Sequence, residues 1–426
     1  MPLRILLLIT FSLGLMNIGV SAQDKSFAKK IIDTLSSPYF AGRGYIDNGD
    51  LKAARFISSK FREFKLNEFE GAKGYVQPFQ MPVNTFPGKM SVSIDGELLI
   101  PGKDYIVDPV SGGCKNQSLK LVFVDSVRLL QMENGNPGKL PHGKFALVFD
   151  KKQLEKAIND KGFEKIISTG LAAIVSINEG SLIWSVSSVN IDIPFIEIKR
   201  NAIKNEAQKI TIQIDALKQD HSTQNVTGYI KGSEYPDSFI FITAHYDHLG
   251  KMGKDTYFPG ANDNASGVAM MLDLAHYFSE RKIKPKYSIG FISFAGEEAG
   301  LIGSKYYTDY PVEPLKNIAF LINMDLMANG QTGMMVVNGS VFPKEYEKLV
   351  HINDSAQYLY ALDKRGKASN SDHYWFSEKG VKAFFFYLLG KYPYYHDIYD
   401  TADKPTMAGY DGAFRLIRDF IVSYRQ

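Results

Sequence analysis

The chain has 426 residues, of which 45% are hydrophobic and 22% charged, as in an ordinary soluble protein. Its formal charge of +3 is too small to indicate a protein that binds nucleic acid or a membrane surface. Cys114 is its single cysteine, which excludes an intrachain disulfide and a thiolate metal site. Any metal ion must therefore be held by histidine and carboxylate side chains.

Residues 1–22 have the features of a signal peptide. Arg4 supplies the positive start, residues 5–16 form an apolar run, and Val20-Ser21-Ala22 is a small-residue cleavage site. The run is shorter than the roughly 20 residues that a membrane span requires, and no later segment approaches that length. We therefore expect a secreted or periplasmic protein without stable membrane insertion after cleavage. A retained N-terminal anchor is the alternative.

Residues 23–91 and 92–216 differ in pattern. In the first segment, Leu51, Ala54 and Ile57 begin an apolar series with the spacing of one buried helical face. The second segment consists of short runs rich in aliphatic, β-branched or aromatic residues, separated by turn signals. Its predicted strands are 119–124, 145–149, 172–176 and 194–198. Because it holds few candidate catalytic groups, we interpret residues 92–216 as an inserted, β-rich accessory domain.

Residues 217–426 alternate between predicted strands and helices. The nearly continuous apolar runs are typical of strands that are buried on both faces. These strands are predicted at 239–243, 289–294, 319–323 and 383–388, and amphipathic helices at 268–278 and 410–424. The alternation predicts an α/β fold with a mixed, mainly parallel central sheet that is flanked by helices.

A possible metal ligand lies close behind each of the four strands, and another precedes the first amphipathic helix. In chain order these residues are His245, Asp263, Glu298, Asp325 and His396. Open α/β sheets bind ligands at the carboxyl ends of their strands, where these side chains are expected to gather. Taken singly, each has a structural explanation, such as a helix cap at Asp263. The five together favour a functional site.

Two histidines and three carboxylates suit a pair of Zn²⁺ ions if one carboxylate bridges them, because each ion then has three protein ligands. Paired metals lower the pKa of a bound water and polarise a carbonyl group. A neighbouring carboxylate must still take the proton of that water. The adjacent pair Glu297-Glu298 can divide this work between metal binding and proton transfer.

These motifs together resemble the co-catalytic di-zinc aminopeptidases, a family that includes the secreted bacterial leucine-type enzymes. Glutamate carboxypeptidases, glutaminyl cyclases and transferrin receptors are more distant relatives. The resemblance covers the chain from about residue 217 to the end, and it extends to the loop around Ala41-Gly42-Arg43. It implies a zinc-peptidase, phosphorylase-like fold. The segments that carry it are 243–250, 260–267, 297–304, 322–325 and 395–401.

Two zinc ions per chain follow from this resemblance. It implies that His245 and Asp325 bind one ion and that Glu298 and His396 bind the other. Asp263 would bridge the two ions.

The resemblance also implies roles for residues beside the ligands. Glu297 would be the general base that activates a metal-bridged water, and Asp247 would orient His245. Tyr395 matches a tyrosine that hydrogen-bonds the developing oxyanion in some members. His248 and His373 are rival histidines, which we interpret as structural or supporting groups because the family spacing selects the other two.

The inserted segment resembles a protease-associated domain, on the basis of Gly143-Lys144-Phe145-Ala146-Leu147-Val148-Phe149 and Ile193-Pro194-Phe195-Ile196. A β insertion of unrelated fold is the alternative. The leading hypothesis is an exported zinc exopeptidase that removes N-terminal residues from peptides. Open alternatives are a glutaminyl cyclase, a carboxypeptidase, and a catalytically silent binding protein on the same scaffold. Peptides are the expected partners, and nucleic acid is not.

Overall fold

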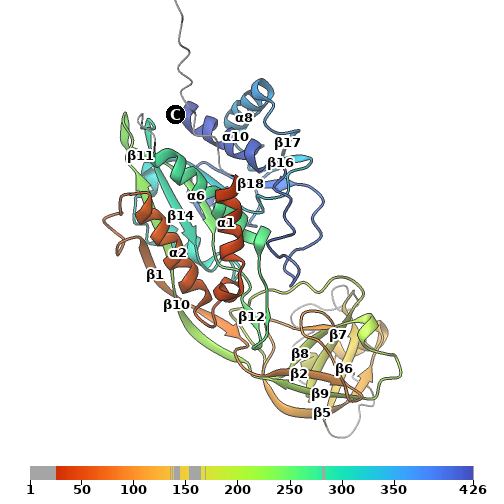
Figure 1. Ribbon diagram of the computed structural model, residues 1–426. Coiled ribbons are helices and arrows are strands. Elements are labelled where there is room, and N and C mark those ends of the chain that lie inside the picture. The colour runs from red at the N-terminus through yellow and green to blue at the C-terminus, as the bar shows by residue number, and fades with distance from the viewer. Residues whose placement is uncertain are drawn as a thin grey trace, which may run out of the picture.

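The computed structural model describes residues 25–134, 136, 138, 144–152, 165–167, 169–280 and 284–425. The predicted signal peptide therefore lies outside the described residues. Two eight-stranded sheets form two lobes, and we call the larger one the catalytic lobe and the smaller one the inserted domain (Figure 1). Among the described helices, none is long and apolar enough to cross a bilayer.

The sheet of the catalytic lobe is mixed. Its strands, in spatial order, are β1 (Val76–Thr85), β10 (Leu217–Ile230), β14 (Tyr287–Phe294), β11 (Tyr235–His245), β15 (Ile318–Met324), β18 (Ala383–Leu389), β16 (Gly333–Val337) and β17 (Leu362–Lys364). The central strands β14, β11, β15 and β18 are parallel. Antiparallel pairs join β1 to β10, β10 to β14 and β16 to β18. The predicted α/β fold with a mainly parallel central sheet is thus confirmed.

Helices cover both faces of this sheet. They are α1 (Lys25–Leu35), α2 (Gly49–Glu63), α6 (Ser266–Ser279), α7 (Ile302–Asp309), α8 (Pro343–Ala356), α9 (His373–Glu378) and α10 (Tyr410–Ser423). In β11, Ile240 and Ile242 pack on the face that α1, α2, α6, α8 and α10 cover. Phe239 and Phe241 point to the other face, where α7 and α9 contribute apolar side chains. The alternation explains why the strand sequence is apolar throughout.

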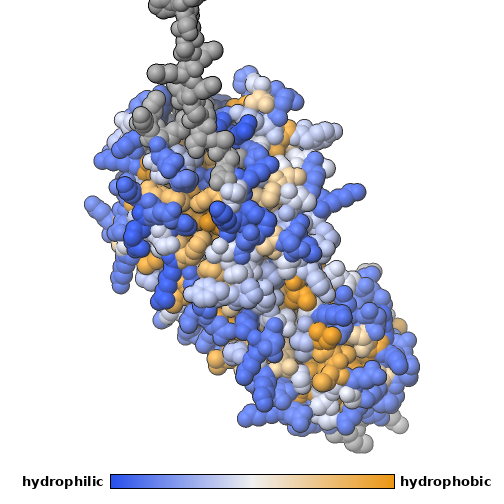
Figure 2. All heavy atoms as spheres, viewed as in Figure 1, coloured by the Kyte–Doolittle hydropathy of each residue, from blue (hydrophilic) through white to orange (hydrophobic). Residues whose placement is uncertain are grey.

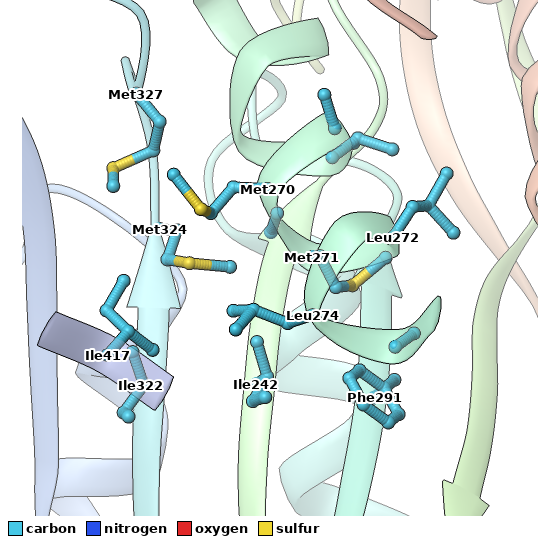
Figure 3. Close-up of a cluster of buried hydrophobic side chains, with 14 of the residues drawn as sticks. Ile242, Met270, Met271, Leu272, Leu274, Phe291, Ile322, Met324, Met327 and Ile417 are labelled. Carbon is cyan, nitrogen blue, oxygen red and sulfur yellow. The ribbon is translucent and has the colours of Figure 1, made fainter. Parts of the chain in front are cut away.

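Helix α6 lies over the centre of the sheet (Figure 3). Its residues Met270, Met271 and Leu274 are fully buried; Met270 lies beside Met324 of β15, and Leu274 lies over Ile242 of β11. Burial of each such side chain contributes roughly 1.5–3 kcal/mol. The helix is therefore firmly fixed, and with it the residues that directly precede its first turn.

The inserted domain contains the second sheet. Its strands, in spatial order, are β3 (Glu97–Leu98), β2 (Met90–Ile94), β9 (Lys209–Ile214), β5 (Cys114–Phe123), β6 (Phe145–Asp150), β7 (Ala173–Asn178), β8 (Phe195–Lys199) and β4 (Tyr105–Val107). Strands β5 to β8 are parallel to one another, and each contains most of one predicted strand. Helix α3 (Ser126–Glu133) follows β5. The sheet runs from Met90 to Ile214, whereas 92–216 was the predicted extent.

The two lobes are joined by chain crossings and by a shared core. Thr85 of β1 pairs with Leu217 of β10, so the chain leaves and re-enters the catalytic sheet at neighbouring positions. Leu249, Met252 and Phe258 belong to the catalytic lobe but are buried in the core of the inserted domain. Met252 lies in the small hairpin of β12 (Lys251–Met252) and β13 (Thr256–Tyr257).

The visible surface is mostly hydrophilic, with an apolar area over the inserted domain (Figure 2).

Candidate metal centre

The predicted ligands meet at one edge of the catalytic sheet, because the four parallel strands end there together. His245 is the last residue of β11, and Asp325 directly follows β15. Glu298 lies in the loop after β14, and His396 lies between β18 and α10. Asp263 occupies a short helical turn, Ala261–Ala265, that leads into α6. Strands β14 and β15 lie on opposite sides of β11, so the site is at a switch point of the sheet.

Asp263 lies between the two predicted ligand histidines. Its Oδ1 is 3.5 Å from Nε2 of His245, and its Oδ2 is 3.0 Å from Nε2 of His396. Nε2 of His245 is also 3.3 Å from Oδ2 of Asp325, whereas Nε2 of His396 is 3.3 Å from Oε2 of Glu298. The structure thus brings all five predicted ligands together, and the carboxylate of Asp263 faces both His245 and His396.

These side chains form two groups with the composition of metal sites. His248, Asp263, Glu298 and His396 offer donor atoms within 4.8 Å of one another, and so do His245, Glu297 and Asp325. Within the described part of the chain, Oδ1 of Asp325 is buried without a hydrogen-bond partner. An unpaired buried oxygen among so many carboxylates is costly unless a cation balances it. Nitrogen and oxygen donors of this kind fit Zn²⁺.

The titration behaviour of the site reflects burial and close charges. Burial would raise the pKa of Asp263, but His396, His248 and His245 hold it well below its usual value. Burial would lower the pKa of His396, but Glu298 and Asp263 raise it to about 9. The pKa shifts of both groups thus reflect the close opposite charges of the candidate metal ligands.

Glu297 is half-buried and belongs to the second group, with His245 and Asp325. Burial raises its pKa well above the usual value, and Asp372 and the neighbouring acidic groups act in the same direction. Its backbone N–H donates to Oδ1 of Asp247 at 3.2 Å, and that of Glu298 donates to Oδ2 of Asp247 at 3.3 Å. The carboxylate of Asp247 thus holds the loop that carries both glutamates.

Asp247 also faces His245, as the sequence predicts. Nδ1 of His245 is 3.1 Å from the backbone oxygen of Asp247 and 3.7 Å from Oδ1 of its carboxylate. The backbone oxygen is the closer acceptor. A proton on Nδ1 leaves Nε2 free to face Asp263 and Asp325, as a metal ligand must.

Tyr395 stacks on the ring of His396, with ring centroids 3.9 Å apart and an angle of 15°. Tyr395 is 46% exposed, so it borders both the site and solvent. Burial of the ring raises the pKa of Tyr395, and the nearby carboxylates add to this. The phenol therefore keeps its proton and can donate it in a hydrogen bond.

Two supporting residues were not assigned these contacts from the sequence. Nδ1 of His248 is 2.7 Å from Oε1 of Glu298, which agrees with the supporting role predicted for this histidine. Asp400 accepts hydrogen bonds from the backbone N–H groups of Asn262 and Asp263. It lies in a motif segment that the sequence analysis singled out. By contrast, His373 lies at the start of α9 against the ring of Phe385 and is absent from both ligand groups.

Arg43 is fully buried behind the site. Its guanidinium donates to five backbone oxygens at 2.7–3.0 Å, those of Leu35, Tyr246, Pro259, Gly260 and Asp263. All five of its N–H groups are therefore used. The loop around Ala41-Gly42-Arg43 was noticed in the sequence only by resemblance, because a buried arginine leaves no periodic signal.

Comparisons with known proteins agree with this geometry. Residues 225–421 match the profile of Peptidase family M28. The chain is 27% identical to Aminopeptidase YwaD of Bacillus subtilis over 355 residues, which are 78% of this chain and 68% of that protein. It is 40% identical to a probable zinc metalloprotease of Pyrenophora teres over 108 residues, which are 25% of this chain. That match covers 23% of the fungal protein, about a quarter of its length.

A solved structure shares the fold over nearly the whole chain. The Peptidase M28 precursor from Shewanella amazonensis has a TM-score of 0.72 and 18% identity, with 95% of this chain and 94% of that chain covered. At this identity the likeness concerns the fold alone. It extends over both lobes, because the aligned part includes nearly all residues.

Proposed function

Residues 225–421 of this chain are a peptidase family M28 domain, and we propose that the chain is an exported zinc-dependent aminopeptidase. It hydrolyses N-terminal residues from peptides. The observation that carries this proposal is the position of Asp263, whose two oxygens face separate histidines at 3.5 and 3.0 Å. The similarity to Aminopeptidase YwaD supports the same activity.

In this proposal His245 and Asp325 hold one zinc ion, and Glu298 and His396 hold the other. Asp263 is shared between them, so that each ion has three protein ligands. The donor atoms and the unpaired oxygen of Asp325 fit this assignment. When bound, the two ions lower the pKa of water and polarise the scissile carbonyl.

Glu297 is the proposed general base. Its carboxylate takes a proton from the water whose oxygen attacks the carbonyl carbon, and it later passes that proton to the leaving amine as the C–N bond breaks. Burial raises the pKa of Glu297, so its carboxylate accepts a proton more readily than that of an exposed glutamate. Tyr395 donates a hydrogen bond to the oxygen that gains negative charge. The carboxylate of Asp247 keeps the Glu297 loop in place because it accepts hydrogen bonds from the backbone N–H groups of Glu297 and Glu298.

Export follows from the proposed signal peptide at residues 1–22. We assign the inserted domain as a protease-associated domain, on the likeness of its strand sequences to that type. It packs beside the ligand edge of the catalytic sheet through Leu249, Met252 and Phe258. From there it restricts which peptides reach the site.

Replacement of Glu297 tests the mechanism. Glu297→Gln keeps the size of the side chain but cannot accept a proton, so we expect kcat to fall by a factor of roughly 10²–10⁴. The zinc content measured by atomic emission should stay at the wild-type value. The matched control is Glu298→Gln, which should lower both zinc content and activity. Comparable activity of Glu297→Gln and wild type would refute the assignment of the base.

Product analysis tests the reaction itself. The full chain is incubated with a peptide library that contains free and acetylated N-termini, and the products are identified by mass spectrometry with and without a chelator. We expect loss of N-terminal residues from free peptides only, and no products with the chelator. Cyclised N-terminal glutamine would instead indicate a glutaminyl cyclase, and loss of C-terminal residues would indicate a carboxypeptidase. The absence of any product would indicate a catalytically silent binding protein.

A further inference from the structure

His396 belongs to the catalytic lobe, but it makes two hydrogen bonds with Trp184 of the inserted domain. The backbone N–H of Trp184 donates to the backbone oxygen of His396 at 2.9 Å. Nδ1 of the His396 ring lies 3.0 Å from the backbone oxygen of Trp184. Because a carbonyl oxygen only accepts, Nδ1 must carry the proton in this contact. Nε2 is the ring nitrogen that faces Asp263 and Glu298.

Trp184 is itself firmly held. It is 4% exposed, and its Nε1 donates to the backbone oxygen of Val107 in β4 at 2.7 Å. Its ring stacks on Phe258 with centroids 4.6 Å apart and an angle of 24°. Val107 belongs to the inserted domain, whereas Phe258 comes from the catalytic lobe. The indole therefore lies at the junction of the two lobes and fixes the backbone that contacts His396.

The conformation of His396 needs such support. Its φ of 53° is in the left-handed region, which is strained for a residue other than glycine. Two residues later, Ile398 packs against the core of the inserted domain. The segment that carries His396 is thus attached to the inserted domain at both its backbone and its side chains.

We propose that Trp184 is a positioning residue for the zinc site of Glu298 and His396, and that docking of the inserted domain sets the metal affinity of this site. The inserted domain supplies the outer hydrogen-bond acceptor that orients the histidine ring. By linkage, zinc bound at this site strengthens the docking of the inserted domain. The inference rests on the proposed zinc sites but goes beyond them, since it gives the inserted domain a part in metal binding.

Zinc titration of variants tests the proposal. Trp184→Ala removes the indole that fixes the backbone contacting His396. We expect one of the two zinc sites to bind zinc about 10–100-fold more weakly, which is the usual loss of affinity when a residue that orients a metal ligand is replaced. The other site should keep its affinity. Trp184→Phe retains ring packing on Phe258 and should recover most of the loss. Isothermal titration calorimetry of the full chain with zinc chloride gives both affinities.

A matched control separates positioning from general destabilisation. Phe149 of β6 is 2% exposed and lies in the other apolar cluster of the inserted domain, apart from Trp184. Phe149→Ala should lower the melting temperature, because it leaves a cavity in the core of the inserted domain. It should leave both zinc affinities unchanged in the folded protein. Equal weakening of zinc binding by Phe149→Ala and Trp184→Ala would overturn the proposal.

Hydrogen exchange of the wild-type chain gives a test that needs no variant. The N–H of Trp184 is bonded to the oxygen of His396, so zinc should slow exchange in the peptide that contains Trp184. Exchange in the peptide that contains Phe149 should not change. Unchanged exchange at Trp184 in zinc-bound protein, or wild-type zinc affinity of Trp184→Ala, would overturn this inference alone. Failure of the wild type to bind zinc would instead refute the proposed function.

Discussion

The hydroxyl group of Tyr45 donates a hydrogen bond of 2.6 Å to Oδ2 of Asp247, although 202 residues separate the two in the sequence. Both side chains are buried. Because the Asp247 carboxylate also accepts the N–H groups of Glu297 and Glu298, Tyr45 is one contact away from the proposed base. The N-terminal segment therefore supports the chemistry at the sheet edge without touching it.

Tyr45→Phe should reduce both stability and turnover. Loss of a hydrogen bond to a charged acceptor costs roughly 1.5–3 kcal/mol. We expect a lower free energy of unfolding in urea and a severalfold lower kcat with little change in KM, because the Glu297 loop loses support. Tyr39→Phe is the control, since Tyr39 lies in the same segment and is 66% exposed. Identical kcat values for Tyr45→Phe and the control would contradict this prediction.

Arg43→Lys should damage the site although the charge is kept. Lysine has three donors where arginine has five, and all five of the Arg43 donors are bonded to backbone oxygens. At least two buried oxygens lose their partner, each at a cost of roughly 1–3 kcal/mol. The expected outcome is a lower melting temperature and weaker zinc binding, because the oxygens of Gly260 and Asp263 are among the acceptors. Arg55→Lys, on the exposed side of α2, should match wild type in both measurements.

Removal of zinc should destabilise the protein as well as abolish activity. A ligand that binds only the folded state at a thousandfold excess over its Kd contributes about 4 kcal/mol. Dialysis against a chelator should therefore lower the melting temperature, and added zinc should restore it. In Asp263→Asn the shared carboxylate is lost, so added zinc should raise the melting temperature much less than in the wild type. A rise as large as in the wild type would argue against the shared position of Asp263.

Stability should decrease on acidification because of His373. Burial lowers its pKa to about 4 from an ordinary value of 6.5. The folded state thus disfavours the charged form, and the unfolded chain binds more protons between these two values. The stabilising contribution is present above about pH 6.5 and is lost as the pH falls toward about 4, to a total of about 3 kcal/mol. His373→Gln should flatten urea-unfolding stability against pH in that window, and an unchanged slope would show that another group is responsible.

The sequence predicted the strands that carry the ligands because their signals are local. Each predicted strand of the catalytic lobe, such as 239–243, lies within a longer strand, here β11 (Tyr235–His245). The ligand edge follows from the rule for open α/β sheets, which needs only the order of strands and polar residues. Prediction of the fold class was correct for the same reason.

Other parts depended on contacts between distant segments, which leave no periodic signal. Strand β1 contains Pro78 and Pro82, which normally argue against a strand, but it is tolerated because it lies at the edge of the sheet. Trp184 gave no signal at all, since its contact with His396 spans 212 residues and uses only backbone groups of the tryptophan. Arg43 was likewise visible only by resemblance. Its role became clear once the five carbonyl groups around it were placed.

The pairing of Thr85 with Leu217 has a consequence for engineering the molecule. Because these residues face each other at the end of a two-stranded ladder, the whole inserted domain takes the place of a hairpin turn, and a short turn could replace it without altering strand register. Such a truncated chain would keep its sheet. It would nevertheless expose Leu249, Met252 and Phe258 to water and lose the carbonyl that faces His396. We therefore expect the shortened chain to keep the catalytic sheet but to bind metal more weakly at the site of Glu298 and His396.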